Sequence, residues 1–578
     1  MSFIDGRLVK HLLPVSVCVV ALLALGLTPY FVCWLAGYGF TCPTQGDVPY
    51  YVQLAAQPYY SHAPFLSDPM VQGGASLYPW LQYLPFVYLT RWLGLQIFWI
   101  QILWTIAAAL GAGLTLYVFL WLVFRNSWLA AGITICVWAD IDLGTGKFAY
   151  RLLFVHQIYL VASDFVAHLR GYPLLARPVF PFQGRLTNPA LDLPLLFLQL
   201  IMTSIAREHP SRRNLILSGL VVAFTFYVYF YLWTMIAAGL CIAILVDRPG
   251  RRTYAWTLAL GVALGWPQIA HDYLIRGALS AEGLKYFGLM TSSSPSSRNS
   301  PYAYPYLIIG ELMILGYWVT RQKRPALLLA WCMSCAGVCL SWAYLVTVYM
   351  HNYHWGWLTA PLMHIVTVAV VLDLIMLWKP RPQMPGWVYA LLVSTYLASG
   401  IYLTASITLI GSHRYDNLKT VYSEYNRQRL APGVIALQPD SVIAGDPAFV
   451  DLAAAAERQR PLAGDFLRIN MILSDEERRD RFVLDQYLSG TNRDALTALM
   501  DDYGPAVFPP QQVPAYLHAF DEVSRDPERF VNDLKVRYLV FPAAQRTPAF
   551  LSSRWELIQP GPYWQIWERV GSGAELKQ

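Results

Sequence analysis

The chain has 578 residues, of which 56% are hydrophobic and 13% are charged. A soluble domain carries about 25% charged residues, so this composition excludes a wholly soluble protein and predicts a chain that lies mostly in lipid. The net charge of +6 is small, and no Lys/Arg-rich run with interleaved aromatic residues is present, so nucleic-acid binding is not expected.

About eleven apolar segments are candidates to cross a bilayer, which needs roughly 20 residues each. They are residues 11–36, 95–124, 127–140, 190–206, 214–227, 229–246, 254–271, 304–320, 325–350, 357–378 and 386–411. The first has no small-residue cleavage site after it, so we expect an uncleaved span rather than a signal peptide. The run 214–246 is too long for one crossing, and it becomes two only if the aromatic cluster Tyr227–Tyr231 marks a turn.

Basic residues set the predicted orientation. If the N-terminus is inside, the short inner segments carry most of the Lys and Arg and few acids, as cytoplasmic loops do. These inner residues are Arg7, Lys10, Arg125, Arg207, Arg212, Arg213, Arg248, Arg251, Arg252, Arg321, Lys323, Arg324, Lys379 and Arg381. Residues 37–94, 141–189 and 272–303 then form long outer loops, a length that usually indicates function.

The outer loops and the end of the chain have their own expected structure. Prolines between aromatic stretches predict short helices lying on the membrane in the first loop, and the second contains an amphipathic stretch at 148–170. We therefore expect a transmembrane domain over 1–411 and a small outer α/β domain over 412–578. In the latter, strands are predicted at Val442–Ala444, Tyr538–Phe541 and Trp564–Val570.

A charged run, Asp475–Arg481, is predicted to be the solvated face of a helix in this domain. Ser474 is its expected N-cap, with Glu477 completing a capping box. Cysteines lie almost entirely in the apolar runs, with Cys42 in an outer loop and none after residue 411. A disulfide framework in the C-terminal domain is therefore excluded.

Acidic residues at the outer ends of two spans are the first candidate site residues. Asp47 follows the first span, where it could act as a general base or a metal ligand, or simply cap a helix that has Pro49 near its start. Asp140 and Asp142 follow the third span beside Gly144 and Gly146. Two carboxylates on irregular backbone can hold one divalent cation such as Mg²⁺ or Mn²⁺, and the alternative is a polar end to the span.

Cations gather in the second outer loop, against the orientation bias. They are Lys147, Arg151, Arg170, Arg177 and Arg185. A phosphate-bearing lipid headgroup would balance them, because Arg binds phosphate in a fork; simple contact with anionic lipid is the alternative. His351 and His354, three residues apart in an outer turn, could share a metal or be an interfacial pair with none.

With an acid in a long first outer loop, a D-x-D at the outer end of the third span and an outer C-terminal domain, the chain resembles the GT-C class of membrane glycosyltransferases. The resemblance implies a polytopic α-helical fold of GT-C type and an acid, here Asp47, as base. In the oligosaccharyltransferase branch a D-x-D helps to hold a divalent metal, which corresponds to Asp140 and Asp142. The Trp-Trp-Asp motif of that branch is absent, as is the Asp-Glu pair of protein O-mannosyltransferases, since Val48 follows Asp47.

The chain looks more like a bacterial polyprenyl-phosphate-sugar transferase. The resemblance implies an inner-membrane hexosyl- or pentosyltransferase that transfers a sugar to a glycan, lipid or protein hydroxyl, with inversion, in cell-envelope glycan biosynthesis. Two alternatives are a lipid-linked-saccharide flippase and a surface-glycan polymerase or ligase. Paired inverted halves, typical of many transporters, are not evident in the sequence.

Overall fold

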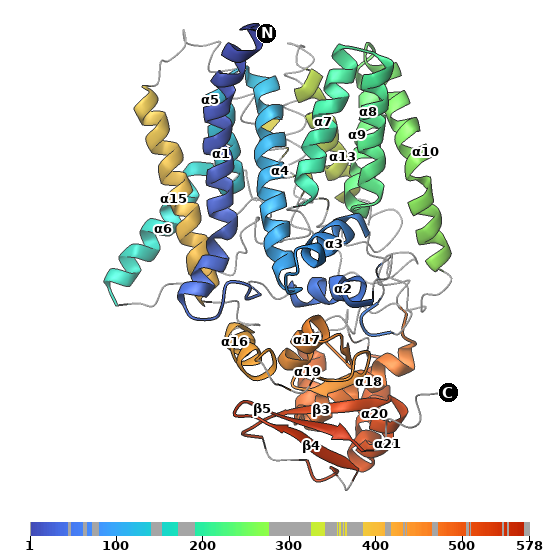
Figure 1. Cartoon of the computed structure of the whole chain (residues 1–578). Coiled ribbons are helices and arrows are strands. Elements are labelled where there is room, and N and C mark those ends of the chain that lie inside the picture. The colour runs from blue at the N-terminus through green and yellow to red at the C-terminus, as the bar shows by residue number, and fades with distance from the viewer. Residues whose placement is uncertain are drawn as a thin grey trace.

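The computed structural model describes most of the chain. The described residues are 2–43, 48–61, 66, 68–71, 80–139, 153–171, 191–276, 325–341, 355, 358–359, 362, 365–366, 385–410, 418–431, 434, 436–464, 472–503, 508, 510–545, 548–551 and 554–570. Figure 1 shows an upright bundle of helices with a smaller region of helices and strands beneath it.

The upright helices occupy the predicted apolar segments. They are α1 (Ser2–Leu35), α4 (Trp99–Phe124), α5 (Ser127–Ala139), α7 (Asp192–Glu208), α8 (Arg212–Phe226), α9 (Phe230–Val246), α10 (Arg251–Arg276), α13 (Pro325–Ser341) and α15 (Gly386–Ile410). Within the described ranges, three stretches are long and apolar enough to cross a membrane: Leu12–Leu35, Trp99–Phe124 and Gly386–Leu409. The segment 304–320 and most of 357–378 lie outside the described residues, so a total of about eleven spans stays a prediction.

The turn that was expected inside 214–246 is confirmed. Helix α8 ends at Phe226, Tyr229 is extended with φ −159°, and α9 begins at Phe230. The rings of Phe226 and Trp233 stack across this turn with centroids 4.5 Å apart. Aromatic side chains therefore stabilise the break as well as marking it in the sequence.

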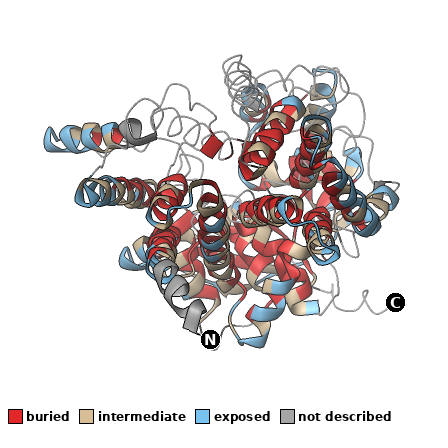
Figure 2. Cartoon of the chain, turned by 90° about the horizontal axis from the view of Figure 1, so that it is seen from above, coloured by how far each residue is buried: buried red, intermediate tan, exposed pale blue. Residues whose placement is uncertain are grey.

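The core of the bundle runs between the helices. Leu22, Leu116, Leu196, Leu240 and Met333, each from a different helix, belong to one cluster of buried residues. Seen from above, buried residues gather on the inward faces and exposed ones on the outward faces (Figure 2). An exposed apolar rim around a packed interior is the pattern expected of helices whose outer faces contact lipid.

Glycines let two of these helices approach closely. A Cβ on Gly219 of α8 would lie 2.6 Å from Leu260 of α10, and one on Gly261 of α10 would lie 2.4 Å from Val222 of α8. Small residues at a contact allow helices to pack without side-chain gaps, which is a common way of joining helices in membranes.

Short helices lie between and beside the upright ones. They are α2 (Val48–Ser61), the 3₁₀ turn η1 (Trp80–Gln82), α3 (Leu84–Trp92) and α6 (Leu153–Leu169). The first three belong to the first outer loop and confirm its expected short helices, and α6 confirms the amphipathic stretch of the second loop. In Figure 1, α2, α3 and α6 lie at the lower end of the bundle. Helix α2, however, is buried between the bundle and the lower region rather than lying on a membrane surface.

The lower region contains a five-stranded sheet and its helices. In chain order these are α16 (Leu418–Arg429), β1 (Val442–Gly445), α17 (Pro447–Ala456), β2 (Arg460–Pro461), α18 (Asp475–Leu488), α19 (Arg493–Tyr503), α20 (Val513–Arg525), α21 (Pro527–Asp533), β3 (Val536–Pro542), β4 (Trp555–Pro560) and β5 (Trp564–Arg569). The strand order is β2-β1-β3-β5-β4. The pairs of β1 with β2 and β3 are parallel, and β5 pairs antiparallel with β3 and β4. The three strands that were predicted are confirmed.

The charged run in α18 is only partly the solvated face that the sequence predicted. Ser474 caps the helix as expected, accepting from the Glu477 amide at 3.1 Å. Arg478 and Arg481, however, are both only 6% exposed, so the prediction is wrong for these two side chains. Arg481 donates to the Glu477 carboxylate at 2.7 Å and to the Leu462 carbonyl at 3.4 Å. Buried guanidinium groups are tolerated when their charge is paired in this way.

A buried ion pair joins α16 to the end of α17. The Nε of Arg429 donates to the Glu457 carboxylate at 2.9 Å, and its Nη2 contacts the same carboxylate. The side chain of Arg429 is 1% exposed and that of Glu457 is 12% exposed. We expect Glu457→Gln to lower the free energy of unfolding of this region by about 3 kcal/mol, because Arg429 would keep its burial and lose its counter-charge. Hydrogen exchange of the β3 and β5 amides measures the change.

Glu476→Gln is the matched control, since the side chain of Glu476 is 79% exposed and its contact with Arg479 spans 3.6 Å. It should change the same exchange rates by less than about 0.5 kcal/mol. Equal effects of the two variants would contradict a stabilising role for the buried pair.

Candidate functional site

Most of the predicted site residues lie outside the described residues. They are Asp47, Asp140, Asp142, Lys147, Arg151, Arg177, Arg185, His351 and His354. Whether the acids and the cations converge therefore stays a prediction. Arg170 is described, and so are the residues on either side of Asp47. A group of three or more His, Cys, Asp or Glu that could hold a metal is not found among the described side chains.

The chain on both sides of Asp47 is anchored in one core cluster. Cys42, at 0% exposure, precedes the Asp47 segment, and Val48, at 2%, follows it as the first residue of α2. Pro49 is the second residue of this helix, as the cap alternative for Asp47 requires.

Helix α2 packs against the bundle on one side and against the C-terminal region on the other. From Val48 to Pro58 every residue but Tyr51 is buried. Tyr59 donates to the Leu95 carbonyl at 2.8 Å, next to the bundle. On the other side, Gln53 donates to the carbonyl and the carboxylate of Asp451 in α17, at 3.2 and 3.0 Å.

A second part of the first outer loop enters the C-terminal region itself. Asp68 accepts from the Met70 and Val71 amides at 2.8 and 3.1 Å, a turn typical of Asp. Met70 is 2% exposed and belongs to the same buried cluster as Val442, Phe482 and Leu539. The C-terminal region therefore completes its core with a side chain from the first outer loop.

Tyrosines of α16 hold the other edge of this junction. Tyr422 hydrogen-bonds to the Thr41 hydroxyl at 2.6 Å, and burial raises the pKa of Tyr422 to about 12. Tyr425 donates to Glu457 at 2.5 Å, and burial, reinforced by the Glu457 charge, raises the pKa of Tyr425 well above its usual range. Both hydroxyls therefore stay neutral at physiological pH, and the junction keeps its hydrogen bonds.

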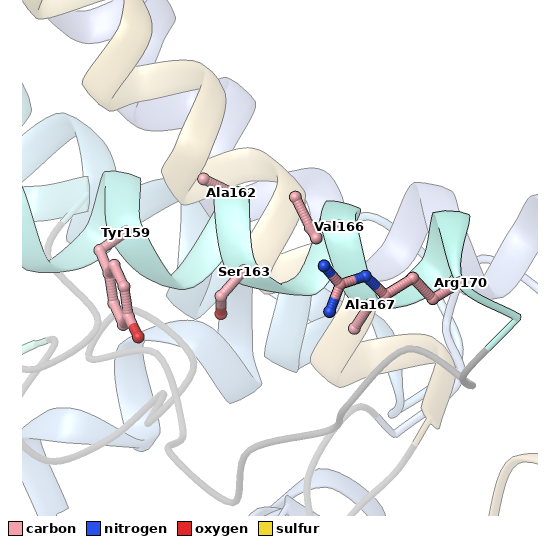
Figure 3. Close-up of a pocket in the computed structure, with 6 residues that line it drawn as sticks. All are labelled: Tyr159, Ala162, Ser163, Val166, Ala167 and Arg170. Atoms are coloured by element: carbon pink, nitrogen blue, oxygen red, sulfur yellow. The ribbon is translucent and has the colours of Figure 1, made fainter.

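Helix α6 of the second outer loop presents an open groove of about 450 Å³. The described side chains that line it recur at the spacing of one helix face: Tyr159, Ala162, Ser163, Val166, Ala167 and Arg170. In Figure 3 the Arg170 guanidinium lies back along this face toward Val166. The groove thus combines apolar surface with a cation, and ion pairing of Arg170 with an acid is not found in the described part of the chain.

A buried carboxylate at the lower end of the bundle was missed by the sequence analysis. Asp192, at the start of α7, is fully buried and accepts from Gln82 at 3.1 Å. Trp104 of α4 donates to the Gln82 carbonyl at 3.0 Å. These contacts fasten η1 of the first outer loop to two bundle helices. The available signal was an acid at the very start of a predicted span, where a carboxylate needs an internal partner.

The solved structures to which this chain is similar include two oligosaccharyltransferase structures and one of ArnT. Archaeal oligosaccharyltransferase AglB from Archaeoglobus fulgidus, with an inhibitory peptide and a dolichol-phosphate, aligns at 14% identity and TM-score 0.38, over 92% of this chain and 70% of that chain. ArnT from Cupriavidus metallidurans, bound to undecaprenyl phosphate, aligns at 11% identity with a TM-score of 0.47. The alignment covers 94% of this chain and 98% of that chain. The Archaeoglobus fulgidus oligosaccharyltransferase in complex with Zn and sulfate aligns at 14% identity with a TM-score of 0.34. The alignment covers 91% of this chain and 68% of that chain.

These neighbours are membrane glycosyltransferases of the GT-C class, the class that the sequence resembles. No family model and no curated protein matches the chain. At such low identities and TM-scores, the likeness alone assigns this chain no activity, substrate or site residue.

The shared core at the junction gives a direct prediction. Met70→Ala should accelerate hydrogen exchange of the β1 and β3 amides, equivalent to a loss of about 2–4 kcal/mol, because it leaves a cavity in the core of the C-terminal region. Met235→Ala, a substitution of another fully buried methionine in α9, is the control. It should destabilise the bundle and leave these strand amides unchanged. Unchanged exchange of the β1 and β3 amides in the Met70→Ala variant would contradict the shared core.

Proposed function

We propose that this chain is a membrane glycosyltransferase. It moves a sugar from a polyprenyl-phosphate donor to a hydroxyl of a glycan, lipid or protein acceptor, at the outer face of a bacterial inner membrane, with the N-terminus in the cytoplasm. The observation that carries the proposal is the burial of α2, which begins at the residue after Asp47, between the bundle and the C-terminal region. A donor held by its tail in lipid and an acceptor from outside would meet at this level.

The groove of α6 supports the donor class. A polyprenyl phosphate has an apolar chain and an anionic headgroup, and the groove pairs apolar side chains such as Ala162 and Val166 with the guanidinium of Arg170. Arg binds phosphate in a fork and keeps its charge at any physiological pH. Lys147, Arg151, Arg177 and Arg185 of the same outer loop would add further positive charge around the phosphate.

The proposed reaction is a single displacement. The acceptor hydroxyl attacks the anomeric carbon while Asp47 takes its proton, since a neutral hydroxyl is a poor nucleophile. The bond from that carbon to the phosphate oxygen breaks, and the cations of the second loop stabilise the negative charge that the phosphate gains. Attack opposite the leaving group inverts the anomeric configuration.

A divalent metal such as Mg²⁺ or Mn²⁺ is part of the proposal as a second source of positive charge. Asp140 and Asp142 would hold it, with His351 and His354 as the less favoured pair. A bound metal would neutralise charge on the departing phosphate. If Asp140 and Asp142 hold it, a chelator should reduce transfer in the wild type and have no further effect in an Asp140→Asn/Asp142→Asn variant.

Replacement of Asp47 tests the proposed base. Asp47→Asn should lower the rate of transfer of labelled sugar from polyprenyl phosphate by about 10²- to 10⁴-fold, because the acceptor proton would lose its base. Asp502→Asn, an exposed position on α19, is the matched control and should keep the wild-type rate. Full activity of the Asp47 variant would remove this residue from the mechanism.

Replacement of Arg170 tests the donor site. Arg170→Ala should raise KM for the lipid donor by about tenfold with a smaller change in kcat, as expected when one charge-assisted contact with the phosphate is lost. Arg212→Ala, an exposed arginine at the opposite end of the bundle, should leave KM unchanged. If purified protein moved the lipid across liposomes without covalent transfer, the flippase alternative would replace the transferase.

A further inference from the structure

Two buried cysteines meet where α1 gives way to the first outer loop. Cys33 lies in the last turn of α1 and Cys42 follows the next turn of chain. Their side chains lie beside one another in one buried cluster, the Cys42 thiol donates to the Pro43 carbonyl at 3.5 Å, and the residues are 1% and 0% exposed. Both belong to the cluster that also contains Val48 of α2 and Tyr422 of α16.

The backbone between them forms a tight reversal. The Tyr38 amide donates to the Cys33 carbonyl at 2.9 Å, and the Cys42 amide donates to the Gly39 carbonyl at 3.4 Å. Gly37 and Gly39 have φ of +83° and +97°, a conformation that glycine adopts without strain. The turn therefore returns the chain over the end of α1 and sets one thiol against the other.

Neighbouring contacts hold this turn in place. The ring of Phe40 packs edge-on against Phe31, with centroids 5.4 Å apart. The carbonyl of Thr41 accepts from Gln101 of α4 at 2.5 Å, and its hydroxyl bonds to Tyr422 at 2.6 Å. The turn between the two cysteines is thus held by packing from three separate parts of the chain.

We propose that Cys33 and Cys42 form a disulfide in the mature protein. The inference rests on the outer-face placement in the proposed function, because an oxidising compartment keeps such bonds while the cytosol reduces them. The first thiolate attacks the disulfide of an oxidised thiol–disulfide oxidoreductase of that compartment and displaces its thiolate. The second then attacks this mixed disulfide. The two cysteines lose two protons and two electrons, and the oxidoreductase leaves as its dithiol.

Burial sets the order of events. The folded thiols are out of reach of a protein oxidant, and Tyr422 of α16, far later in the chain, covers the turn. Oxidation therefore takes place before the C-terminal region packs on the first outer loop. The bond then closes a ring from residue 33 to 42, which ends five positions before Asp47, and it restrains the chain that leads to the proposed base.

The test is a peptide map of the full chain, purified from membranes after quenching with N-ethylmaleimide and without reductant. The expected species is a 33–42 segment that carries no maleimide and is lighter by two hydrogen atoms than the reduced form. Cys241, which is exposed on α9, should be alkylated and serves as the internal control. Reduction, or the Cys33→Ser/Cys42→Ser variant, should lower the Tm by about 3–6 °C, and Cys241→Ser should not.

A second experiment distinguishes a wrong Cys33–Cys42 pairing from a wrong placement of the turn at the outer face. Protein purified under reducing conditions is treated with diamide after partial unfolding and refolding. If the bond forms here but not in cells, the turn faces a reducing compartment, which overturns both the proposal and the outer-face placement. If it forms in neither arm, the pairing is wrong, while glycosyl transfer and its loss in Asp47→Asn remain a separate measurement.

Discussion

The burial of α2 on two sides is the constraint on which the rest of the structure depends. A helix of the first outer loop is covered by the bundle above and by α17 below, and Gln53 completes two hydrogen bonds across the lower contact. An unpaired amide buried at this depth would cost about 1–3 kcal/mol, so the two layers are fastened at defined positions. The C-terminal region is therefore a structural part of this end of the bundle rather than an appendage.

This constraint also explains how the proposed chemistry could be kept in place. Met70 fills the core of the C-terminal region, and Asp192 with Gln82 fastens η1 to the bundle, so the first outer loop is held at several points along its length. A general base works only when it is held near the proton that it removes. Loop 37–94 is long, yet its described parts have the contacts of a folded unit.

Much of the architecture was predictable because it follows from local patterns. Tyr227 and Tyr229 marked the turn between α8 and α9, and short apolar runs marked the central strands β1 and β3. The features that the sequence did not predict depend on contacts with residues far away in the chain. Charge alone suggested a solvated Arg478 and Arg481, and no local pattern shows that Met70 completes a core almost 400 residues later. The proposed acids themselves lie outside the described residues, so their convergence stays a prediction.

The central claim is that a lipid phosphate binds at the end of the bundle that carries α2, α6 and the C-terminal region. An experimental density map of the full chain in a lipid nanodisc with polyprenyl phosphate tests it most directly. The account predicts phosphate density in contact with Arg170, on the side of the membrane that carries the C-terminal region, with Asp47 facing the same cavity. Phosphate bound at the opposite end, near Arg212, or an Asp47 carboxylate directed away from any lipid-accessible cavity, would contradict it.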